Sequence, residues 1–519
     1  MTNPSHINQY RLRLTRSFFL GAIAFMMIGI TLPAFASTYV PLDSDIYRIL
    51  TLLDAEGVIT SGLLSTKPLS RNEVRRLYQE AERSDRKADP AVRDLIANLK
   101  ERIDPAGEGP TFKPVDEITL ARISTDAPIE SMRYARYLKT RSTLELSQPF
   151  HYNNDGKLLQ NGTALLTDVS SRIDDLSLVS FFVRGELTES HGDDDFRFRS
   201  SYGVLSYGSI DVLVGKDAQW WGPGEHGALL ISNNAESLSM VRVMSSSPLE
   251  LPWIFRYLGK FGFTFFTAEM DKARTDYPSP ILWGLRFDLK PIPYLELGFE
   301  RTAIIGGKGR PVTEATMMRS VTGYRENISA VEAGDQIAGG DIKVTLPFQS
   351  QPLQLYAEIA GEDKQAAMPF KRGYVMGLYA PRIVNIDSID FRVEYATDRV
   401  PNEKYLWYMH DIYSDGYTYE GVIMGHHMGT DARDLFLETT YHFPGARHSI
   451  TLSRDREDHN VYGPIRERRI ENQLSGSFSI TSRVMLTAEY GRGTIKNPEN
   501  TIAPPIAFHD AEAMVRIRF

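Results

Sequence analysis

The feature that most constrains the fold is an alternation of apolar and polar side chains from about residue 138 to the carboxy terminus. Consecutive strand residues point to opposite faces, so a period of two predicts strands with one apolar and one polar face. In residues 389–395 the apolar positions are Ile389, Phe391, Val393 and Tyr395, and the positions between them are Asp390, Arg392 and Glu394. The chain is therefore predicted to be mainly β.

Alternation alone does not separate a soluble sandwich or propeller from a membrane barrel, because each buries one strand face in an apolar environment. The last residues favour the barrel. Ala513, Val515, Ile517 and Phe519 alternate with Met514, Arg516 and Arg518, so the final strand ends on an aromatic residue, as in outer-membrane barrels. We expect a large antiparallel transmembrane β-barrel over residues 130–519, with about 18 strands. The polar segments 306–340 and 399–419 are expected to be extracellular loops.

The amino terminus has the pattern of an export signal. Three arginines precede an apolar run at residues 18–32, which ends in the A-x-A sequence Ala34-Phe35-Ala36. A retained anchor is disfavoured because this run is shorter than the ~20 residues that a membrane-spanning helix needs. We expect residues 1–36 to be a signal peptide and the mature protein to reach the bacterial outer membrane.

Composition excludes several classes of protein. The chain has 0 Cys, which rules out a disulfide scaffold, a Cys-based metal site and a Cys nucleophile. Its formal net charge is −8 and it lacks basic clusters, so nucleic acid is not an expected partner.

Residues 37–115 have helical periodicity instead. Ser70 and Glu73 form a capping-box pattern, and Asp89-Pro90 is a typical helix start. We expect a small periplasmic helical unit that covers the mouth of the barrel, since three short helices cannot bury all their apolar residues among themselves. A faint similarity to an S-layer-homology repeat leaves binding to cell wall open. The predicted helix starts are Asp43 or Ser44, Ser70 and Asp89.

Two adjacent tryptophans, Trp220 and Trp221, follow Gln219 and precede a Gly-Pro-Gly turn. A strand predicted at residues 210–216 leads into them, so the pair stands where the chain leaves its sheet. Flat indole rings suit the apolar faces of sugars, the aromatic belt of a membrane barrel, or ordinary loop packing, and the residues leave these three alternatives open.

The run QWWGPGEHGALLISNNA, followed by Pro248 and Trp253, resembles the signature region of the Wzi-type capsule assembly proteins of the outer membrane. The resemblance covers nearly all of the predicted mature chain. It implies a lectin-like surface protein that assembles or retains capsular or other surface polysaccharide, with no enzymatic activity, cofactor or metal. Expected further partners are outer-membrane lipid and the barrel assembly machinery, and the protein is expected to be a monomer.

Exposed aromatic rings stack on sugar C–H faces and amides bond sugar hydroxyls, so aromatic and amide side chains are the candidates for glycan binding. A second aromatic segment lies at residues 405–419, where a membrane-interface girdle is the alternative interpretation. The candidate glycan-binding residues are Gln219, Trp220, Trp221, Asn233, Asn234, Tyr405, Trp407 and Tyr413.

Two other functions remain open at this stage. One is an outer-membrane diffusion channel, in which charged residues of the lumen would set selectivity. The other is a hydrolase or metal site built on His426-His427 with Asp411, Asp415 and Asp431, although adjacent histidines on a strand would face opposite ways.

Overall fold

The structure is a computed structural model. It describes residues 36–103, 111–126, 152–157, 159, 161–190, 193–322, 334–365, 368–383, 386–399, 407–445, 447–459 and 464–519. Most of the predicted signal peptide, the start of the alternation near residue 138, and Tyr405 lie outside these residues. Within the described part of the chain, no helix is long and apolar enough to cross a membrane.

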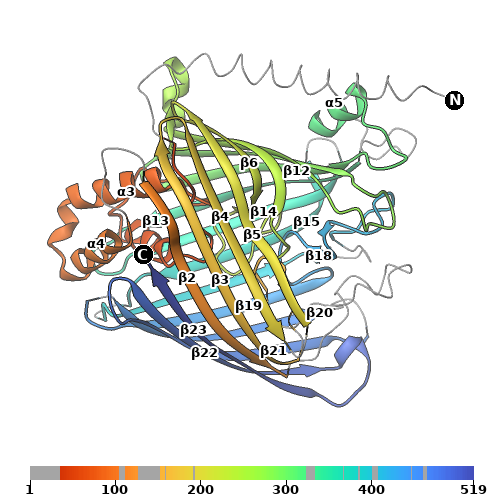
Figure 1. The fold of residues 1–519 in the computed structure, drawn as a ribbon. Helices are drawn as coiled ribbons and strands as arrows, with labels where there is room; N and C mark the ends of the chain where they lie inside the picture. The colour runs from red at the N-terminus through yellow and green to blue at the C-terminus, as the bar shows by residue number, and fades with distance from the viewer. Residues whose placement is uncertain are drawn as a thin grey trace.

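The described residues form a closed antiparallel barrel of eighteen strands, which confirms the predicted fold class (Figure 1). Each strand pairs with the next along the chain, and the last strand returns to the first, with Glu117 opposite Arg518 and Thr125 opposite Asp510. The wall strands are β2 (Thr111–Thr125), β3 (Gly162–Leu176), β4 (Val179–Ser190), β5 (Asp193–Tyr207), β6 (Ile210–Asp217), β8 (Leu238–Ser245), β10 (Lys260–Glu269), β11 (Ile281–Ile292), β12 (Leu295–Ile305), β13 (Gly334–Leu346), β14 (Leu353–Gln365), β15 (Met368–Ala380), β16 (Ile389–Thr397), β19 (Ala432–His442), β20 (His448–His459), β21 (Glu467–Ser479), β22 (Val484–Lys496) and β23 (Ile506–Arg518).

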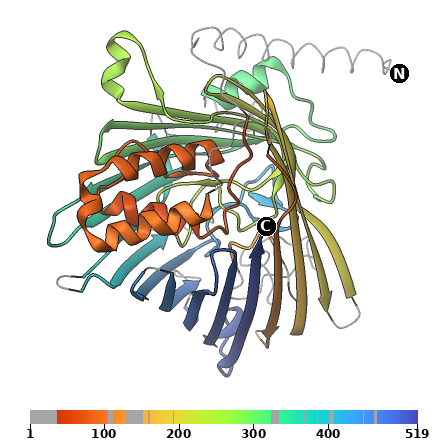
Figure 2. The same cartoon turned by 60° about the vertical axis from the view of Figure 1, so that its left-hand side comes forward.

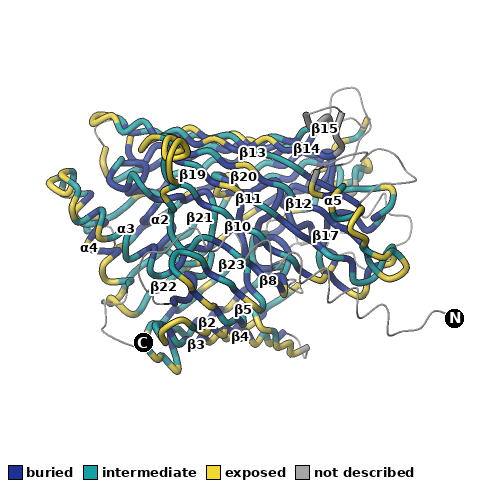
Figure 3. Tube along the Cα trace, turned by 90° about the horizontal axis from the view of Figure 1, so that it is seen from above, coloured by how far each residue is buried: buried dark blue, intermediate teal, exposed yellow. Residues whose placement is uncertain are grey.

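The polar faces of the strands point inward, opposite to a soluble sandwich. In β16 the charged residues Asp390, Arg392 and Glu394 are buried in the barrel, whereas Tyr395 on the other face is exposed. Buried and more exposed residues alternate along the wall strands in the same way (Figure 3). A closed wall with an apolar outer face satisfies its backbone hydrogen bonds and can face lipid hydrocarbon.

The barrel begins earlier than the predicted boundary at residue 130, because β2 is already a wall strand. Its pairing with β3 shifts register between Lys113 and Glu117, and Pro114 lies within the shift. This irregularity breaks the period of two and hides the strand from the sequence pattern. Likewise β13 begins at Gly334, inside the segment predicted to be a loop up to residue 340.

The two ends of the barrel differ. Links 177–178, 208–209 and 293–294 give tight turns at one end, whereas the segments 218–237, 398–399 and 407–431 lie outside the wall strands at the other end. We call these the short-turn end and the long-loop end. Short additional elements are β9 (Leu249–Glu250), η2 (Trp253–Leu258), α5 (Glu314–Thr322) and η3 (Pro498–Asn500).

The predicted helical unit lies at the short-turn end, with its helices across part of the barrel mouth (Figure 2). Ser70 accepts a hydrogen bond from the amide of Glu73, and Asp89 caps the helix that starts at Pro90, both as predicted. The first helix has Asp45 as its N-cap residue instead of the expected Asp43 or Ser44, and the Asp43 side chain accepts a hydrogen bond from Arg184 of the barrel wall. The helices are α2 (Ile46–Ala55), α3 (Arg71–Arg83), η1 (Asp85–Ala88) and α4 (Pro90–Arg102).

Buried ion pairs fasten this unit to the wall. Asp54, at the end of α2, lies 3.3 Å from Nζ of Lys290 and 3.2 Å from Nζ of Lys343, and accepts a hydrogen bond from Gln354. All four side chains are buried. Glu56 similarly pairs with Arg382 at 2.9 Å. Charged side chains of the wall strands and of the β15–β16 link therefore hold the helical unit in place.

The substitution Asp54→Asn is expected to weaken this docking by about 3 kcal/mol, because it removes the buried carboxylate that pairs with both Lys290 and Lys343. The helical unit should then become sensitive to protease at a lower urea concentration than in the wild type. Asp94→Asn, at a partly exposed position of α4, is the matched control. Equal protection of both variants would contradict an ion-paired docking.

Candidate functional site

The tryptophan pair forms a short strand inside the barrel. Strand β7 (Trp220–Trp221) pairs with β1 (Thr66–Lys67) of the helical unit, with Trp220 opposite Lys67 and Trp221 opposite Thr66. The amide of Gly222 donates to the carbonyl of Ser65 at 2.8 Å, which extends the pairing. The helical unit thus reaches up the lumen and joins the segment that carries the predicted site.

Both indole rings are covered. Trp220 is 5% and Trp221 0% exposed, so neither ring is presented at the surface where the chain leaves its sheet. The indole N–H of Trp220 donates to the carbonyl of Gly224, and Trp221 packs edge-on against Phe266 of the wall, with 5.5 Å between ring centroids. In this structure both rings make ordinary packing contacts, which is one of the three alternatives that the sequence left open.

Wall carboxylates hold the Gly-Pro-Gly turn by its backbone. Glu394 accepts hydrogen bonds from the amides of Glu225 and His226, at 2.9 and 3.1 Å, and Glu358 accepts from Leu229 at 2.8 Å. A Cβ atom on Gly222 would lie 2.7 Å from a Glu358 oxygen, and the φ angle of Gly222 is +127°. Glycine is therefore required here for close approach of the backbone to the wall.

The predicted amide residues also make internal contacts. Asn233 donates through its side chain to the carbonyl of Asn153 at 2.8 Å, and Asn234 donates to the carbonyl of Ile423 at 2.9 Å. The side chain of Gln219 lies 3.2 Å from the sulfur of Met240. These amides connect chain segments in the lumen.

The second aromatic segment folds inward onto the first. Tyr408 donates its hydroxyl hydrogen to the carbonyl of Leu229 and accepts from the amide of His426, at 2.8 and 2.9 Å. Burial raises the pKa of Tyr408 well above its usual value, so the phenol keeps the proton it donates. Trp407 and Tyr413 are also fully buried, so this part of the predicted loop 399–419 packs inside the barrel. We call residues 152–157, 218–237 and 407–431 together the plug.

The outward side of the plug is less buried. Arg274, from the β10–β11 link, donates to the carbonyls of Gly416 and Thr418, both at 3.0 Å. Tyr277 packs on Tyr413 with 5.6 Å between centroids, and Arg310 lies over both rings. We call the partly exposed residues here the outer plug surface: Tyr277, Arg310, Met409, His410, Ile412 and Tyr419.

A polar hollow of about 460 Å³ lies on the rim of the same end, where β2, β3 and β23 meet. Carboxylates, hydroxyls and amides of this kind bond the hydroxyls of sugars. The residues around the hollow are Ser124, Thr125, Asp126, Asn161, Gly162, His509, Asp510 and Ala511.

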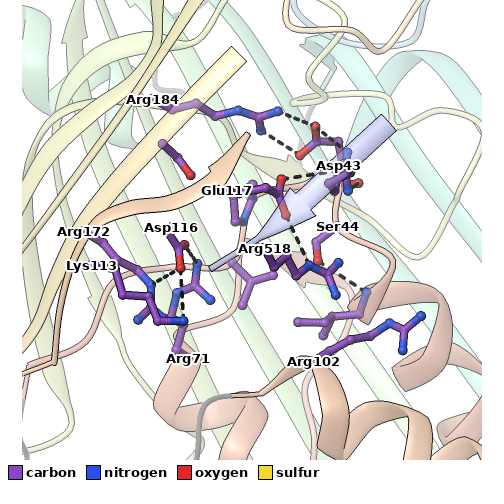
Figure 4. Close-up of a pocket in the computed structure, with 15 residues that line it drawn as sticks. Asp43, Ser44, Arg71, Arg102, Lys113, Asp116, Glu117, Arg172, Arg184 and Arg518 are labelled. Atoms are coloured by element: carbon purple, nitrogen blue, oxygen red, sulfur yellow. Dashed lines mark hydrogen bonds and ion pairs between the residues drawn. The ribbon is translucent and has the colours of Figure 1, made fainter. Parts of the chain in front are cut away.

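A charged cavity of about 60 Å³ lies at the other end, between the helical unit and the wall (Figure 4). Arg184 faces Asp43 at 2.8 Å, and Arg518 faces Glu117 at 3.2 Å. Burial raises the pKa of Asp43, but Arg184 and other nearby arginines outweigh it and hold that pKa well below its usual range. Each cation labelled in the figure has a carboxylate partner. The ion pairs around this cavity therefore join the helical unit to the wall, and the labelled cations do not form a free anion site.

The model of the capsule assembly protein Wzi family matches residues 132–503. The chain belongs to the Wzi capsule assembly family. A Klebsiella pneumoniae relative, named an uncharacterized 55.8 kDa protein in the cps region, is 26% identical over 365 residues, which are 70% of this chain. The match spans 65% of the relative's own length.

The Wzi fold is shared as well. The solved structure of Escherichia coli Wzi, an outer-membrane carbohydrate-binding β-barrel involved in group 1 capsule assembly, matches with a TM-score of 0.71. Sequence identity is 20%, and the match covers 93% of this chain and 100% of the other. The Wzi family match includes the plug segments 218–237 and 407–431.

The sequence motifs single out residues 219–234 and 405–419 as candidate glycan-binding segments, but not the wall residues that hold the plug. Glu358 and Glu394 lie on the polar faces of strands that show the alternation, and this position was the only sequence pattern that indicated an inward-facing role for them. Tyr277 gave no signal, because the link that carries it has neither a motif nor periodicity.

The substitution Trp221→Ala is expected to destabilise the barrel by about 3–5 kcal/mol, because it empties a fully buried site beside Phe266. The heat-induced mobility shift in SDS gels should therefore occur at a lower temperature. Trp253→Ala is the control, since Trp253 is 88% exposed. Identical transition temperatures for the two variants would show that the indole of Trp221 does not stabilise the fold.

Proposed function

We propose that this protein is a lectin-like outer-membrane protein that binds capsular polysaccharide at the cell surface and helps to assemble or retain it, without catalytic turnover. The observation that carries the proposal is the filled lumen: the plug and the helical unit meet inside the barrel through β1 and β7. A filled barrel favours binding at its surface over passage through it. Membership of the Wzi capsule assembly family supports polysaccharide as the ligand.

The proposed orientation follows from the two barrel ends. Bacterial barrels have short periplasmic turns and longer extracellular loops, so the helical unit would be periplasmic and the outer plug surface extracellular. Residues 1–36 would serve as the signal peptide. The exposed apolar residues of the outer wall would contact outer-membrane lipid, and the strand ending in Phe519 would be recognised by the barrel assembly machinery. We propose that the protein acts as a monomer, since the barrel closes within one chain.

The proposed glycan site is the outer plug surface, together with the polar hollow on the rim. Tyr277 and Tyr419 offer partly exposed rings for stacking, and Arg310 and His410 offer nitrogen atoms to sugar oxygens. Of the original candidates, Trp407 and Tyr413 would position this surface from beneath, because Tyr413 contacts Tyr277 directly. The other candidates would hold the plug in place deeper in the barrel. They are Gln219, Trp220, Trp221, Asn233 and Asn234.

The channel alternative is tested in planar lipid bilayers. Purified wild-type protein is expected to show no stable open state, because buried side chains of the plug and of the helical unit occupy the lumen. A large and steady unit conductance would instead support a diffusion channel.

The substitution Tyr277→Ala is expected to weaken binding of purified capsular polysaccharide about tenfold, through loss of stacking and apolar burial. Capsule retention on cells should fall with it. Tyr207→Ala is the control, because Tyr207 is an exposed tyrosine at the short-turn end. Correctly assembled Tyr277→Ala protein could still bind normally while a variant of the rim hollow, such as Asp126→Ala, loses polysaccharide binding. That result would place the glycan site in the hollow instead of on the outer plug surface.

A further inference from the structure

Four buried side chains with metal-binding atoms meet where the plug touches the wall. His226 comes from the Gly-Pro-Gly segment, His427 from the second plug segment, Asp434 from β19 and Asp455 from β20. One nitrogen or oxygen atom from each lies within 4.8 Å of those of the other three. Four parts of the chain that are far apart in sequence thus present donor atoms to one point.

The spacing of these atoms suits tetrahedral coordination. Nε2 of His226 and Nε2 of His427 each lie 3.3 Å from the same Asp434 oxygen, and Nε2 of His226 lies 3.6 Å from an Asp455 oxygen. Ligands at zinc–nitrogen and zinc–oxygen distances in a tetrahedron are about 3.3 Å from one another. The donor atoms would need only small shifts to surround an ion.

Ring packing holds both imidazoles in place. The His226 ring stacks on Phe436 and the His427 ring on Tyr152, each with 3.8 Å between centroids. The two imidazole rings meet nearly at right angles, with centroids 4.7 Å apart. Their nitrogens are therefore directed before any ligand arrives, as ordered metal sites require.

The buried carboxylates need a positive partner. The Asp434 side chain is 2% exposed and the Asp455 side chain is 4% exposed. None of their oxygens accepts a well-formed hydrogen bond from the described residues, although imidazole nitrogens lie at ion-pair distances. Glu457 adds a third carboxylate 3.5 Å from His427. Burying closely spaced carboxylates is costly, and a divalent cation would offset more of their negative charge than the imidazoles do.

We propose that His226, His427, Asp434 and Asp455 bind a structural Zn²⁺ ion that fastens the plug to the barrel wall. Two imidazole nitrogens with two carboxylate oxygens form a zinc donor set, whereas Ca²⁺ and Mg²⁺ prefer oxygen ligands alone. The ion would join both plug segments to two adjacent strands. The site is separate from the proposed glycan surface and does not depend on that function.

The sequence had suggested a different set of partners for His427. Asp411, Asp415 and Asp431 were the nearby carboxylates, but the donors that surround His427 come from residues 226, 434 and 455. The rings of His426 and His427 lie 4.5 Å apart instead of facing opposite ways, because residues 424–431 form turns rather than a strand. The expectation of no metal site is replaced by this proposal.

Metal content of purified, detergent-solubilised full-length protein tests the proposal. After equilibration with ZnCl₂ and removal of free ion, the wild type is expected to retain about one Zn²⁺ per chain. His427→Gln and Asp455→Asn should bind Zn²⁺ at least about tenfold more weakly. His442→Gln is the matched control, because His442 pairs with the buried Asp390 at 2.7 Å outside the cluster. Wild-type protein with no more Zn²⁺ than the Asp455→Asn variant would overturn the proposal.

Two further readouts keep the test independent of whether the variants fold. Chelation with EDTA should lower the temperature of the mobility shift for the wild type and for His442→Gln. Co²⁺ in place of Zn²⁺ should give the intense visible bands of a four-coordinate ion with nitrogen and oxygen ligands. Absence of those bands, or binding of Ca²⁺ in preference to Zn²⁺, would refute a zinc site. Loss of the ion with unchanged glycan binding would leave the proposed function intact.

Discussion

Carboxylates on the inner wall bind the backbone of both parts that lie inside the barrel. Glu358 and Glu394 accept backbone N–H groups of the plug, and Glu296 accepts the amide of Ser65 from the helical unit. A wall of eighteen strands encloses more space than its own side chains can fill. Its inward charges need partners because they are buried, and the plug and the helical unit provide them. Wall and contents therefore depend on one another.

The pairing of β1 with β7 makes the two inserted parts continuous. A short piece of the helical unit lies beside the tryptophan pair, and the same pair leads into the Gly-Pro-Gly turn at the wall. One connected body thus extends from the helices at the short-turn end to the aromatic segment at the long-loop end. This arrangement favours a protein that presents a fixed surface, because moving the plug would break pairing, ion pairs and packing together.

The conspicuous aromatic residues of the plug are buried and make internal contacts. Tryptophan and tyrosine are typical of sugar-binding surfaces, yet they also fill large interior spaces while keeping a polar group that needs a partner. Trp220 and Tyr408 show this second use, since each bonds a backbone carbonyl inside the plug. The rings of the proposed glycan site, such as Tyr277, lie one layer further out and carry no recognisable motif.

The sequence by itself determined the features that depend on local backbone geometry. The alternation placed Asp390, Arg392 and Glu394 on one strand face, because the strand pleat depends only on neighbouring residues. Ser70 and Asp89 indicated helix starts for the same reason, since a helix cap forms with residues two or three positions away. The family could be recognised from the order QWWGPGEHGALLISNNA. Only the tertiary structure decided that Trp221 is covered, and that His226 meets Asp434 and Asp455. Burial and donor geometry depend on segments that are distant in sequence, and the folding of two loops into the lumen leaves no periodic trace in the chain.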